Sequence, residues 1–396
     1  MNLADVLKRT SALNTGYTPQ IFDFQRRKAR EEVAKLFRRR SILFARDSYE
    51  EQLKEYFAVM NPALVYTPEF EDHFEAYRKE GANLLPSYQQ GRWVYFPWNA
   101  TIVHILEEKA FQRVRTARNM NLIRREEQEV FYKAAVGIAG LSVGNSVAAA
   151  IVLQGGGRHI RLADPDTLAL SNTNRIRAGV ESLGLKKAVM TAQHLYAINP
   201  YLHIEVLREG LTEKNLKKFF EGPPRLDIVV DEMDNLAMKY LLREHARRLK
   251  CPVVMGADNG DNAVVDIERY DRNPRLPFFH GRMGKVSHEG LKSLNKFGIG
   301  KMITKHVGPE NVTSRMRESL LQMGKTIVSW PQLGGAALLN GAAVACSVRR
   351  ILNHQPIISN RAIVSLDEKL IPGYDAPRAR KARLKSAAAF KKMFGL

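Results

Sequence analysis

Short apolar runs alternate with longer amphipathic stretches between residue 134 and about residue 270 of the chain. The apolar runs end in polar residues, which is typical of buried strands. They predict strands within 134–140, 159–166, 203–207, 226–234 and 251–258, separated by helices at 145–154, 186–199, about 212–220 and 236–249. This alternation predicts a Rossmann-like α/β fold with a doubly wound, mostly parallel sheet that binds ligands at the carboxyl ends of its strands.

The pattern before residue 110 is different. Apolar residues at a spacing of three to four predict helices within 22–41 and 48–60, and the β-branched and aromatic residues of 91–106 predict strands. Residues 1–110 are therefore interpreted as an N-terminal α+β extension. A polar helix is predicted over 111–134, where the chain leads into the first strand of the sheet.

Composition narrows the class of protein. The chain has 396 residues, 45% of them hydrophobic, which is enough for two or three domains. No apolar run approaches the length of a membrane-spanning helix, and the first ten residues lack the apolar core of a secretory signal. The two cysteines, Cys251 and Cys346, exclude a disulfide framework and a four-cysteine zinc site. We therefore expect a cytoplasmic protein without a membrane span.

The net charge of +20 is high for a chain of this length. Seven lysines and arginines lie between 378 and 392, a segment that contains no acid. Such a surface attracts acidic partners, which include nucleic acid, anionic lipid and acidic proteins, although a solvated basic surface explains the charge equally well.

A glycine turn follows the first predicted strand of the sheet. Gly137, Gly140 and Gly144 lie in the sequence GIAGLSVGNSVA, between this strand and the first predicted helix. Backbone N–H groups at such a turn form an anion site that suits the phosphates of a nucleotide. The spacing departs from the strict dinucleotide pattern, so the turn alone leaves NAD and ATP open.

Polar residues at the later strand ends favour ATP. Asp164 and Asp166 end the second strand. The polar residues after this strand suit the binding of hydroxyl or phosphate groups; they are Ser171, Asn172, Asn174, Arg175, Lys186 and Lys187. Asp231, Glu232 and Asp234 end a further strand. An arginine, a lysine and an additional carboxylate suit a triphosphate with Mg²⁺ better than they suit NAD.

The order of these motifs resembles the ThiF/MoeB/E1 superfamily of ATP-dependent adenylyltransferases, which activate the C-terminal carboxylate of a protein. The resemblance rests on DPDTLALSNTNR at 164–175, GLKKA at 184–188 and DEMDN at 231–235. It implies an ATP-binding adenylation domain over 111–365, followed by a basic tail over 366–396. A homodimer that uses the small-residue segment SWPQLGGAALLNGA is also implied.

The resemblance also implies roles for individual residues. Asp164 would hold the ribose, and backbone N–H groups around Gly140 would face the phosphates. The β- and γ-phosphates would be neutralised by Asn172, Arg175 and Lys187, and Mg²⁺ would be oriented by Asp234. Asp166 would support this cluster, and Arg118 would supply a further arginine, which in some family members acts across a dimer.

Several departures from the family pattern change the expected chemistry. Ile176 replaces a glutamine, and the glycine turn carries an extra residue. The paired C-x-x-C motifs are absent, so no zinc is expected. No cysteine lies within 271–330, and Cys251 and Cys346 are interpreted as packing residues. The expected chemistry is adenylation without a thioester on this chain.

The acceptor stays open at this point. The first hypothesis is a Mg²⁺- and ATP-dependent adenylyltransferase that acts on the C-terminus of a small protein or peptide, or on a carboxylate or amide of a small molecule. The alternatives are a tRNA-modifying relative, a non-catalytic nucleotide-binding module and an NAD-dependent oxidoreductase. The tail after Pro377 is predicted to form a helix with Leu384, Ala388 and Met393 on one stripe. Its basic face, with Arg380, Arg383, Lys391 and Lys392, suits nucleic acid, an anionic surface or an acidic partner. The alternative is a frayed, solvated terminus.

Overall fold

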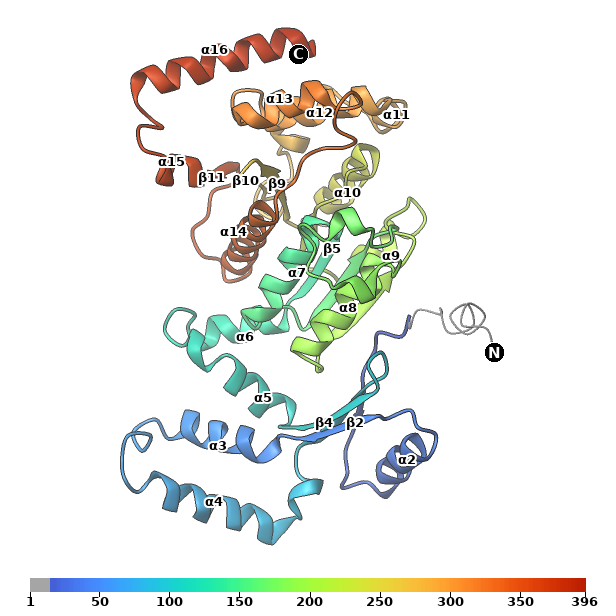
Figure 1. Ribbon diagram of the computed structural model, residues 1–396, viewed down its shortest axis with the longest axis vertical. Helices are drawn as coiled ribbons and strands as arrows, with labels where there is room; N and C mark the ends of the chain where they lie inside the picture. The colour runs from blue at the N-terminus through green and yellow to red at the C-terminus, as the bar shows by residue number, and fades with distance from the viewer. Residues whose placement is uncertain (1–14) are drawn as a thin grey trace. The chain divides into compact units, whose positions relative to one another are not determined.

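The computed structural model describes residues 15–396 (Figure 1). The chain forms two compact units. The first contains the described residues up to Glu129 together with Ala192–Leu202, and the second contains Val130–Thr191 and His203–Leu396. Each unit has its own sheet.

The first unit is built on a four-stranded sheet with the strand order β1-β3-β4-β2. Its strands are β1 (Gln20–Phe22), β2 (Phe44–Asp47), β3 (Arg92–Phe96) and β4 (Thr101–Ile105). Its helices are α2 (Arg27–Arg38), α3 (Tyr49–Met60), α4 (Phe70–Leu84) and α5 (Glu108–Arg115), and α6 (Arg125–Lys133) leads into the second unit. The antiparallel β3–β4 pair corresponds to the strands predicted within 91–106.

The aromatic residues of β3 pack inside the first unit. Tyr95 is buried against α2, in a cluster that includes Val33 and Ile102. The Trp93 ring stacks on the imidazole of His104 at a centroid distance of 4.5 Å. Aromatic rings bury large areas, so β3 supplies much of the stabilisation of this sheet.

The polar helix predicted over 111–134 is wrong as a continuous element. The segment forms two helices, α5 and α6, separated by a short 3₁₀ turn, η2 (Ala117–Asn119), and an irregular loop. Asn121 adopts a left-handed backbone with φ of 69°. Helix α5 has already ended at Arg115, and Met120 is extended with a ψ of 133°, so the left-handed turn at Asn121 lies in the loop between the two helices. Asparagine tolerates this conformation better than most residues.

The second unit confirms the predicted doubly wound, mostly parallel sheet. Its seven strands have the order β11-β10-β9-β8-β5-β6-β7. They are β5 (Ala135–Ala139), β6 (His159–Ala163), β7 (His203–Leu207), β8 (Ile228–Asp231), β9 (Val253–Asn259), β10 (Asn262–Glu268) and β11 (Arg361–Val364). Strands β5 to β9 are parallel to one another, whereas β10 pairs antiparallel with both β9 and β11.

Helices cover both faces of this sheet. One face is covered by α7 (Val143–Leu153), by α14 (Gly334–Leu352) and by the start of α8 (Lys187–Ile198). The other face carries α9 (Leu216–Glu221) and α10 (Leu236–Arg248), whose apolar side chains pack in one cluster with β5, β8 and β9. The strand ends that face ligands are therefore framed by helices on both sides.

Helix α14 is a long apolar helix of 19 residues that contains most of the small-residue segment noted in the sequence. Among the described residues it is the one helix whose length and composition, with a mean hydropathy of 1.2, would allow it to cross a membrane. Half of this apolar segment is buried inside the molecule. Its side chains pack against α7, β9 and β10, so α14 serves here as a core helix of the second unit.

The C-terminal segment packs on the second unit through aromatic residues. Helix α16 (Pro377–Phe394) lies against α12 (Lys296–Val307) and α13 (Ser314–Gln322), in a cluster that contains Phe390 and Phe394. The packing stripe predicted from Leu384 and Met393 is wrong. These two residues are 55% and 64% exposed, whereas Phe390 is 1% exposed. The larger rings bury more apolar area, and they therefore decide which face of α16 turns inward.

The two faces of α16 should respond differently to truncation of a side chain. Phe390→Ala removes a buried ring and is expected to lower the free energy of unfolding by about 3–5 kcal/mol. Leu384→Ala, on the exposed side of the same helix, should change it by less than about 0.5 kcal/mol. Urea unfolding followed by circular dichroism measures both values. Equal losses for the two variants would contradict the packing described here.

Candidate functional site

The glycine turn joins β5 to the N-terminus of α7. Gly140 has a φ of 86°, and a Cβ placed on it would lie 2.3 Å from the carbonyl oxygen of Glu232. A Cβ on Gly144 would approach Ile138 to 3.1 Å. The turn therefore depends on residues without side chains, and the first N–H groups of α7 point out of the helix with no partner within it. This arrangement suits an anion.

Gly137 lies elsewhere, in the middle of β5. A Cβ at this position would come within 2.4 Å of Leu226 and 2.7 Å of Phe219. These side chains belong to the opposite side of the sheet, where α9 packs. Two of the three glycines thus shape the turn, and the structure places Gly137 where close packing requires a small residue.

Asp164 connects the end of β6 to the glycine turn. One oxygen of its carboxylate accepts the N–H of Leu141 at 2.6 Å, and the other accepts the N–H of Asp166 at 2.8 Å. The residue is 4% exposed. Burial raises the pKa of Asp164, while the two backbone hydrogen bonds and the nearby Lys187 oppose this rise. The carboxylate holds the turn and the strand end in one arrangement.

Lys187 and Asp166 form an ion pair beside Asp164. Lys187 begins α8, and its Nζ lies 2.8 Å from the Oδ2 of Asp166. The lysine is almost fully buried, whereas the Asp166 side chain is largely exposed. The cation is therefore fixed at the carboxyl end of β6, on the same edge of the sheet as the glycine turn.

Arg175 reaches the start of α7. Its Nε donates to the Oγ of Ser142 at 2.9 Å, and its Nη1 donates to the Oδ1 of Asn174 at 2.9 Å. Burial lowers the pKa of Arg175, and the carboxylates of Asp258 and Asp234 act against this shift. The guanidinium therefore lies within electrostatic reach of two acids and next to the anion site.

The two asparagines before Arg175 have different contacts. The Oδ1 of Asn172 accepts the N–H of Ala169 at 3.0 Å, so this side chain closes its own turn. The Nδ2 of Asn174 donates to the carbonyl of Gln332 at 2.8 Å, just before α14. Asn174 thereby fixes the loop that carries Arg175 to the segment preceding this helix.

The three acids at the end of β8 point to different places. Asp231 is fully buried and pairs with Arg243 at 2.5 Å and with Lys239 at 3.2 Å. The carboxyl group of Glu232 turns inward and accepts the N–H of Gly256 at 2.7 Å, and burial raises its pKa well above the ordinary value. Asp234 is exposed. Of the three, Asp234 is the one open to a ligand.

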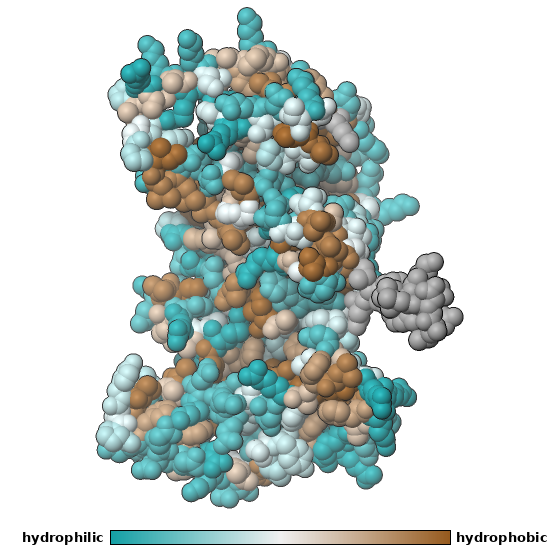
Figure 2. Space-filling model, viewed as in Figure 1, coloured by the Kyte–Doolittle hydropathy of each residue, from teal (hydrophilic) through white to brown (hydrophobic). Residues whose placement is uncertain are grey.

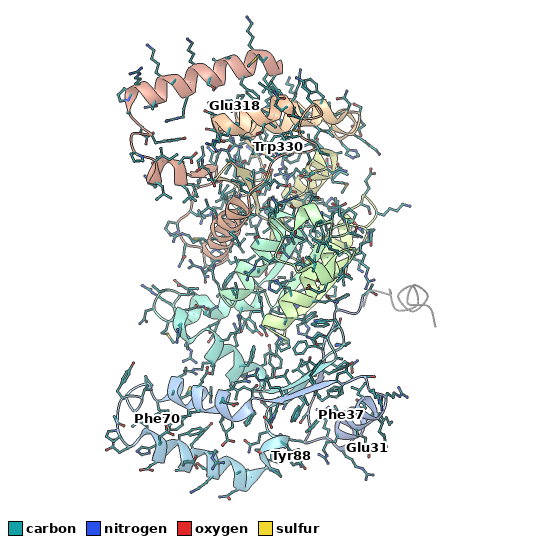
Figure 3. The ribbon with its side chains drawn as sticks, in the orientation of Figure 1. Glu31, Phe37, Phe70, Tyr88, Glu318 and Trp330 are labelled. Atoms are coloured by element: carbon teal, nitrogen blue, oxygen red, sulfur yellow. The ribbon has the colours of Figure 1, made fainter. Side chains whose placement is uncertain are left out.

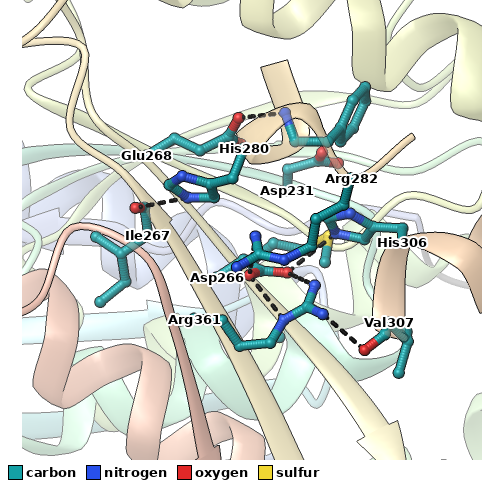
Figure 4. Close-up of polar contacts among 12 residues, drawn as sticks. Asp231, Asp266, Ile267, Glu268, His280, Arg282, His306, Val307 and Arg361 are labelled. Atoms are coloured by element: carbon teal, nitrogen blue, oxygen red, sulfur yellow. Dashed lines mark hydrogen bonds and ion pairs between the residues drawn. The ribbon is translucent and has the colours of Figure 1, made fainter. Parts of the chain in front are cut away.

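A network of buried charges lies behind the strand ends (Figure 4). Asp266 on β10 contacts Arg361 on β11 at 2.6 Å and His306 on α12 at 3.0 Å. Burial opposes ionisation of Asp266, but hydrogen bonds from His306 and Arg361 prevail and lower its pKa below the usual range. Arg243 connects β10 to β8. Its Nε lies 2.7 Å from the carboxylate of Glu268 on β10, and its Nη1 pairs with Asp231 on β8. Paired buried charges of this kind fix the positions of β8, β10 and β11.

Sequence reasoning did not select Asp258, which lies close to Arg175. Its Oδ1 accepts from the Nδ2 of Asn340 on α14 at 2.7 Å, and its Oδ2 accepts from the Nε2 of Gln332 at 3.3 Å. Burial raises the pKa of Asp258, and these hydrogen bonds and Arg175 oppose the rise. The available signal was its position at the end of a predicted strand, but nothing local to Asp258 pointed to partners more than 70 residues away.

The remaining residues considered from the sequence are Arg118 and the two cysteines. Arg118 belongs to η2 in the first unit, where its side chain is exposed, and its role stays a prediction. Cys251 is 2% exposed, and burial raises the pKa of its thiol. Cys346 is half-buried within α14, and neither cysteine forms a disulfide.

The residues at the strand ends fit a nucleotide with Mg²⁺. The glycine turn offers N–H groups to phosphates, Arg175 and Lys187 supply cations, and Asp234 supplies an open carboxylate. Within residues 15–396 no group of three or more histidines, cysteines or acids could hold a metal ion by itself. Mg²⁺ is commonly bound through one or two carboxylates and the phosphates of its substrate, so Asp234 and a triphosphate would suffice.

Comparison with known proteins identifies relatives of this chain. A family model described as the ThiF family matches residues 116–268. An uncharacterized protein of Mycobacterium tuberculosis, MT1398, is 34% identical over 308 residues, which cover 76% of this chain and 42% of that protein. The sulfur carrier protein adenylyltransferase of Thermus thermophilus is 30% identical over 161 residues, or 40% of this chain and 56% of that enzyme. The chain thus spans about half the length of these two relatives.

A third relative is named as an enzyme of tRNA. The tRNA threonylcarbamoyladenosine dehydratase of Escherichia coli is 29% identical over 203 residues, which are 51% of this chain and 74% of that enzyme. A crystal structure of E. coli tRNA N6-threonylcarbamoyladenosine dehydratase matches this chain with a TM-score of 0.44 and 20% identity, covering 61% of this chain and 95% of that one.

Removal of the Asp164 carboxylate should loosen the glycine turn. Asp164→Ala leaves two N–H groups without acceptors, and the free energy of unfolding is expected to fall by about 1–3 kcal/mol. Asp261→Ala changes an exposed aspartate of the same unit and should alter it by less than about 0.5 kcal/mol. Urea unfolding of both variants tests the expectation, which fails if they lose equal stability.

Proposed function

Since residues 116–268 belong to the ThiF family, we propose that the chain is an ATP- and Mg²⁺-dependent adenylyltransferase that activates a carboxylate. A carboxylate oxygen attacks the α-phosphorus of ATP, the bond to the β-phosphate breaks, and the products are an acyl adenylate and pyrophosphate. The observation that carries this proposal is the position of Arg175, which donates to Ser142 at the start of α7. A cation there faces any phosphate bound at the helix N-terminus.

Each residue at the strand ends has a physical role in this reaction. The turn at Gly140 and the first N–H groups of α7 hold phosphate oxygens. Arg175 and Lys187 neutralise the charge that accumulates on pyrophosphate as it leaves, and Asn172 keeps the turn before Arg175 closed. Asp164, which lies beside the turn, holds the ribose of the nucleotide. Asp166 keeps Lys187 in place through their ion pair. Mg²⁺ bound by Asp234 and the phosphates would supply further positive charge.

The proposed acceptor is the C-terminal carboxylate of a small protein or peptide. One relative is named for a sulfur carrier protein, which supports an acceptor of this kind. The two cysteines do not suit a thioester step, because Cys251 is buried with a raised pKa and Cys346 lies inside α14. The activated carboxylate would therefore pass to a nucleophile from outside this chain.

A second candidate is modification of a tRNA. It is favoured by the relative named as a tRNA dehydratase and by the net charge of +20. The same phosphate chemistry would then activate a group on the RNA. A nucleotide-binding module without catalysis is a third reading, to which Ile176 and the altered glycine turn lend support.

We also propose that the chain acts as a homodimer in the cytoplasm. Gly335, Leu338 and Ala342 form an exposed stripe of small and apolar residues along α14, which would allow another helix to approach closely. In such a dimer Arg118 would be available to the site of the partner. The unpaired cysteines and the use of ATP agree with a reducing compartment.

The nucleotide preference can be measured directly. Isothermal titration should give ATP binding that depends on Mg²⁺ and no comparable binding of NAD, because the cations at the strand ends suit a triphosphate. Arg175→Ala should weaken ATP binding, whereas Arg177→Ala should not, since Arg177 is exposed two residues further on. Tight NAD binding that ignores magnesium would overturn the proposal.

Catalysis is tested by ATP–pyrophosphate exchange with a panel of carrier-protein C-termini. Arg175→Ala and Asp234→Asn should each lower exchange by about two to three orders of magnitude, which is typical for the loss of one positioned electrostatic group. Arg177→Ala, Cys251→Ala and Cys346→Ala should leave exchange unchanged if the variants fold. A folded cysteine variant that forms adenylate but fails to transfer it would show that a thioester step takes place on this chain.

A further inference from the structure

Four cations follow one line along the outer side of α16. Arg378, Lys381, Lys385 and Lys392 lie at positions i, i+3, i+7 and i+14, which share one face of a helix. All four are exposed. With a rise of about 1.5 Å per residue, they span about 21 Å. We refer to these four residues as the basic stripe.

The basic stripe points away from the packed face of the helix. Ala387, Phe390 and Phe394 are buried on the inner side, and the half-buried Arg383 binds the Tyr374 carbonyl there. Figure 3 shows long side chains projecting from α16 on the side opposite Glu318 and Trp330. The aromatic anchors thus set the rotation of the helix and leave the stripe open to solvent.

The cations of the stripe have no acidic partners within the described part of the chain, residues 15–396. Helix α16 contains no aspartate or glutamate. No ion pair involves any of the four side chains among residues 15–396, whereas the nearby Lys369 and Arg383 each contact an acid. Four like charges on one face repel each other, and an anionic ligand would relieve that repulsion.

The residues around the stripe favour a polynucleotide over a membrane or a protein. Alanines lie between the cations, and the two phenylalanines of α16 are used for internal packing. The exposed Leu384 and Met393 lie on opposite flanks of the stripe, each about 60° from the nearest cation, so they form no apolar strip on the contacting face. In Figure 2 the side chains that project above α16 are hydrophilic. Membrane-surface helices and protein hot spots both need an apolar or aromatic anchor on the contacting face. A row of cations without such an anchor, and without asparagine or glutamine to read bases, suits a phosphate backbone.

We propose that the basic stripe of α16 binds the phosphate backbone of RNA without reading its sequence. The stripe lies outside the ThiF-matched residues 116–268, so it adds a surface to the catalytic domain instead of extending the nucleotide site. The choice of RNA over DNA rests on the second candidate function. The backbone contact itself rests on the geometry and charge of α16 alone.

The test replaces the four cations and keeps the helix. The variant Arg378→Gln, Lys381→Gln, Lys385→Gln and Lys392→Gln is compared with the unchanged chain in fluorescence anisotropy titrations of labelled tRNA over a salt series. Loss of four phosphate contacts should weaken binding at low salt by about tenfold or more and reduce the log–log salt slope by about 3. Substitution is preferred to deletion of α16, because deletion also removes Phe390 and Phe394 from the core.

A matched control carries the same change in net charge. Lys35→Gln, Arg38→Gln, Arg39→Gln and Arg40→Gln alter four exposed cations at the end of α2 in the first unit. This variant should keep the affinity and the salt slope of the unchanged chain. Circular dichroism verifies that both variants are folded. ATP titration should be unaffected in both, so loss of RNA binding with intact ATP binding separates this proposal from the proposed function.

Several outcomes would overturn the proposal. The stripe is excluded as the contact if the unchanged chain does not bind tRNA at low salt. It is also excluded if the stripe variant binds tRNA as tightly as the unchanged chain. An equal loss in the control variant shows that net charge alone is responsible. Equal affinity for duplex DNA of the same charge overturns the choice of RNA, and binding to vesicles rich in anionic lipid with none to tRNA assigns the stripe to a membrane surface.

Discussion

The backbone of Gly140 passes so close to the carbonyl of Glu232 that no side chain fits between them. Two further bonds lock this approach: the N–H of Gly140 donates to Ala163 at 2.8 Å, and the N–H of Glu232 donates to Ala139 at 2.7 Å. The ends of β5, β6 and β8 are thereby joined at one point, immediately before α7 begins. The open end of that helix, the Asp164 carboxylate and the exposed Asp234 all take their positions from this junction.

The charges of the molecule divide into two groups by their surroundings. Buried cations such as Arg243 and Arg361 have carboxylate partners at 2.5–2.7 Å, as the cost of burying an unpaired charge requires. Arg175 is different, because its direct hydrogen bonds go to neutral oxygens while the acids nearby act at longer range. A cation held in this way keeps its capacity to attract a phosphate. Neutral partners alone do not mark a ligand site, because the buried Arg317 also donates to backbone carbonyls and serine hydroxyls. Arg175 differs from Arg317 in its position beside the glycine turn.

Sequence patterns predicted five strands of the second unit, β5 to β9, because each is a short apolar run that ends in polar residues. They missed β10 and β11, the two strands that pair antiparallel at the edge of the sheet. From the same apolar-to-polar pattern, Asp164, Asp166 and Asp234 could be placed at strand ends before the structure was known. The contact of Asp258 with Asn340 could not, because it joins residues 82 positions apart on elements whose packing is decided by the whole sheet. The inward face of α16 was also missed, since helical periodicity gives two apolar stripes and only the tertiary partner selects Phe390 and Phe394. The extended backbone at Met120 and the left-handed turn at Asn121 lie in the loop that separates α5 from α6, which the side-chain pattern alone had joined.

The packing of α14 against α7 has a consequence for how the chain reaches its native state. The two helices make the most extensive helix–helix contact of the second unit, yet almost 200 residues of sequence separate them. During synthesis β5, α7 and β6 are complete long before Gly334 leaves the ribosome. One apolar face of the partly formed sheet therefore stays uncovered. Contacts of such long range are slow to form, and exposed apolar surface in the meantime favours aggregation. The apolar face beside α7 is therefore the surface of this unit that stays exposed longest during synthesis, until α14 closes over it.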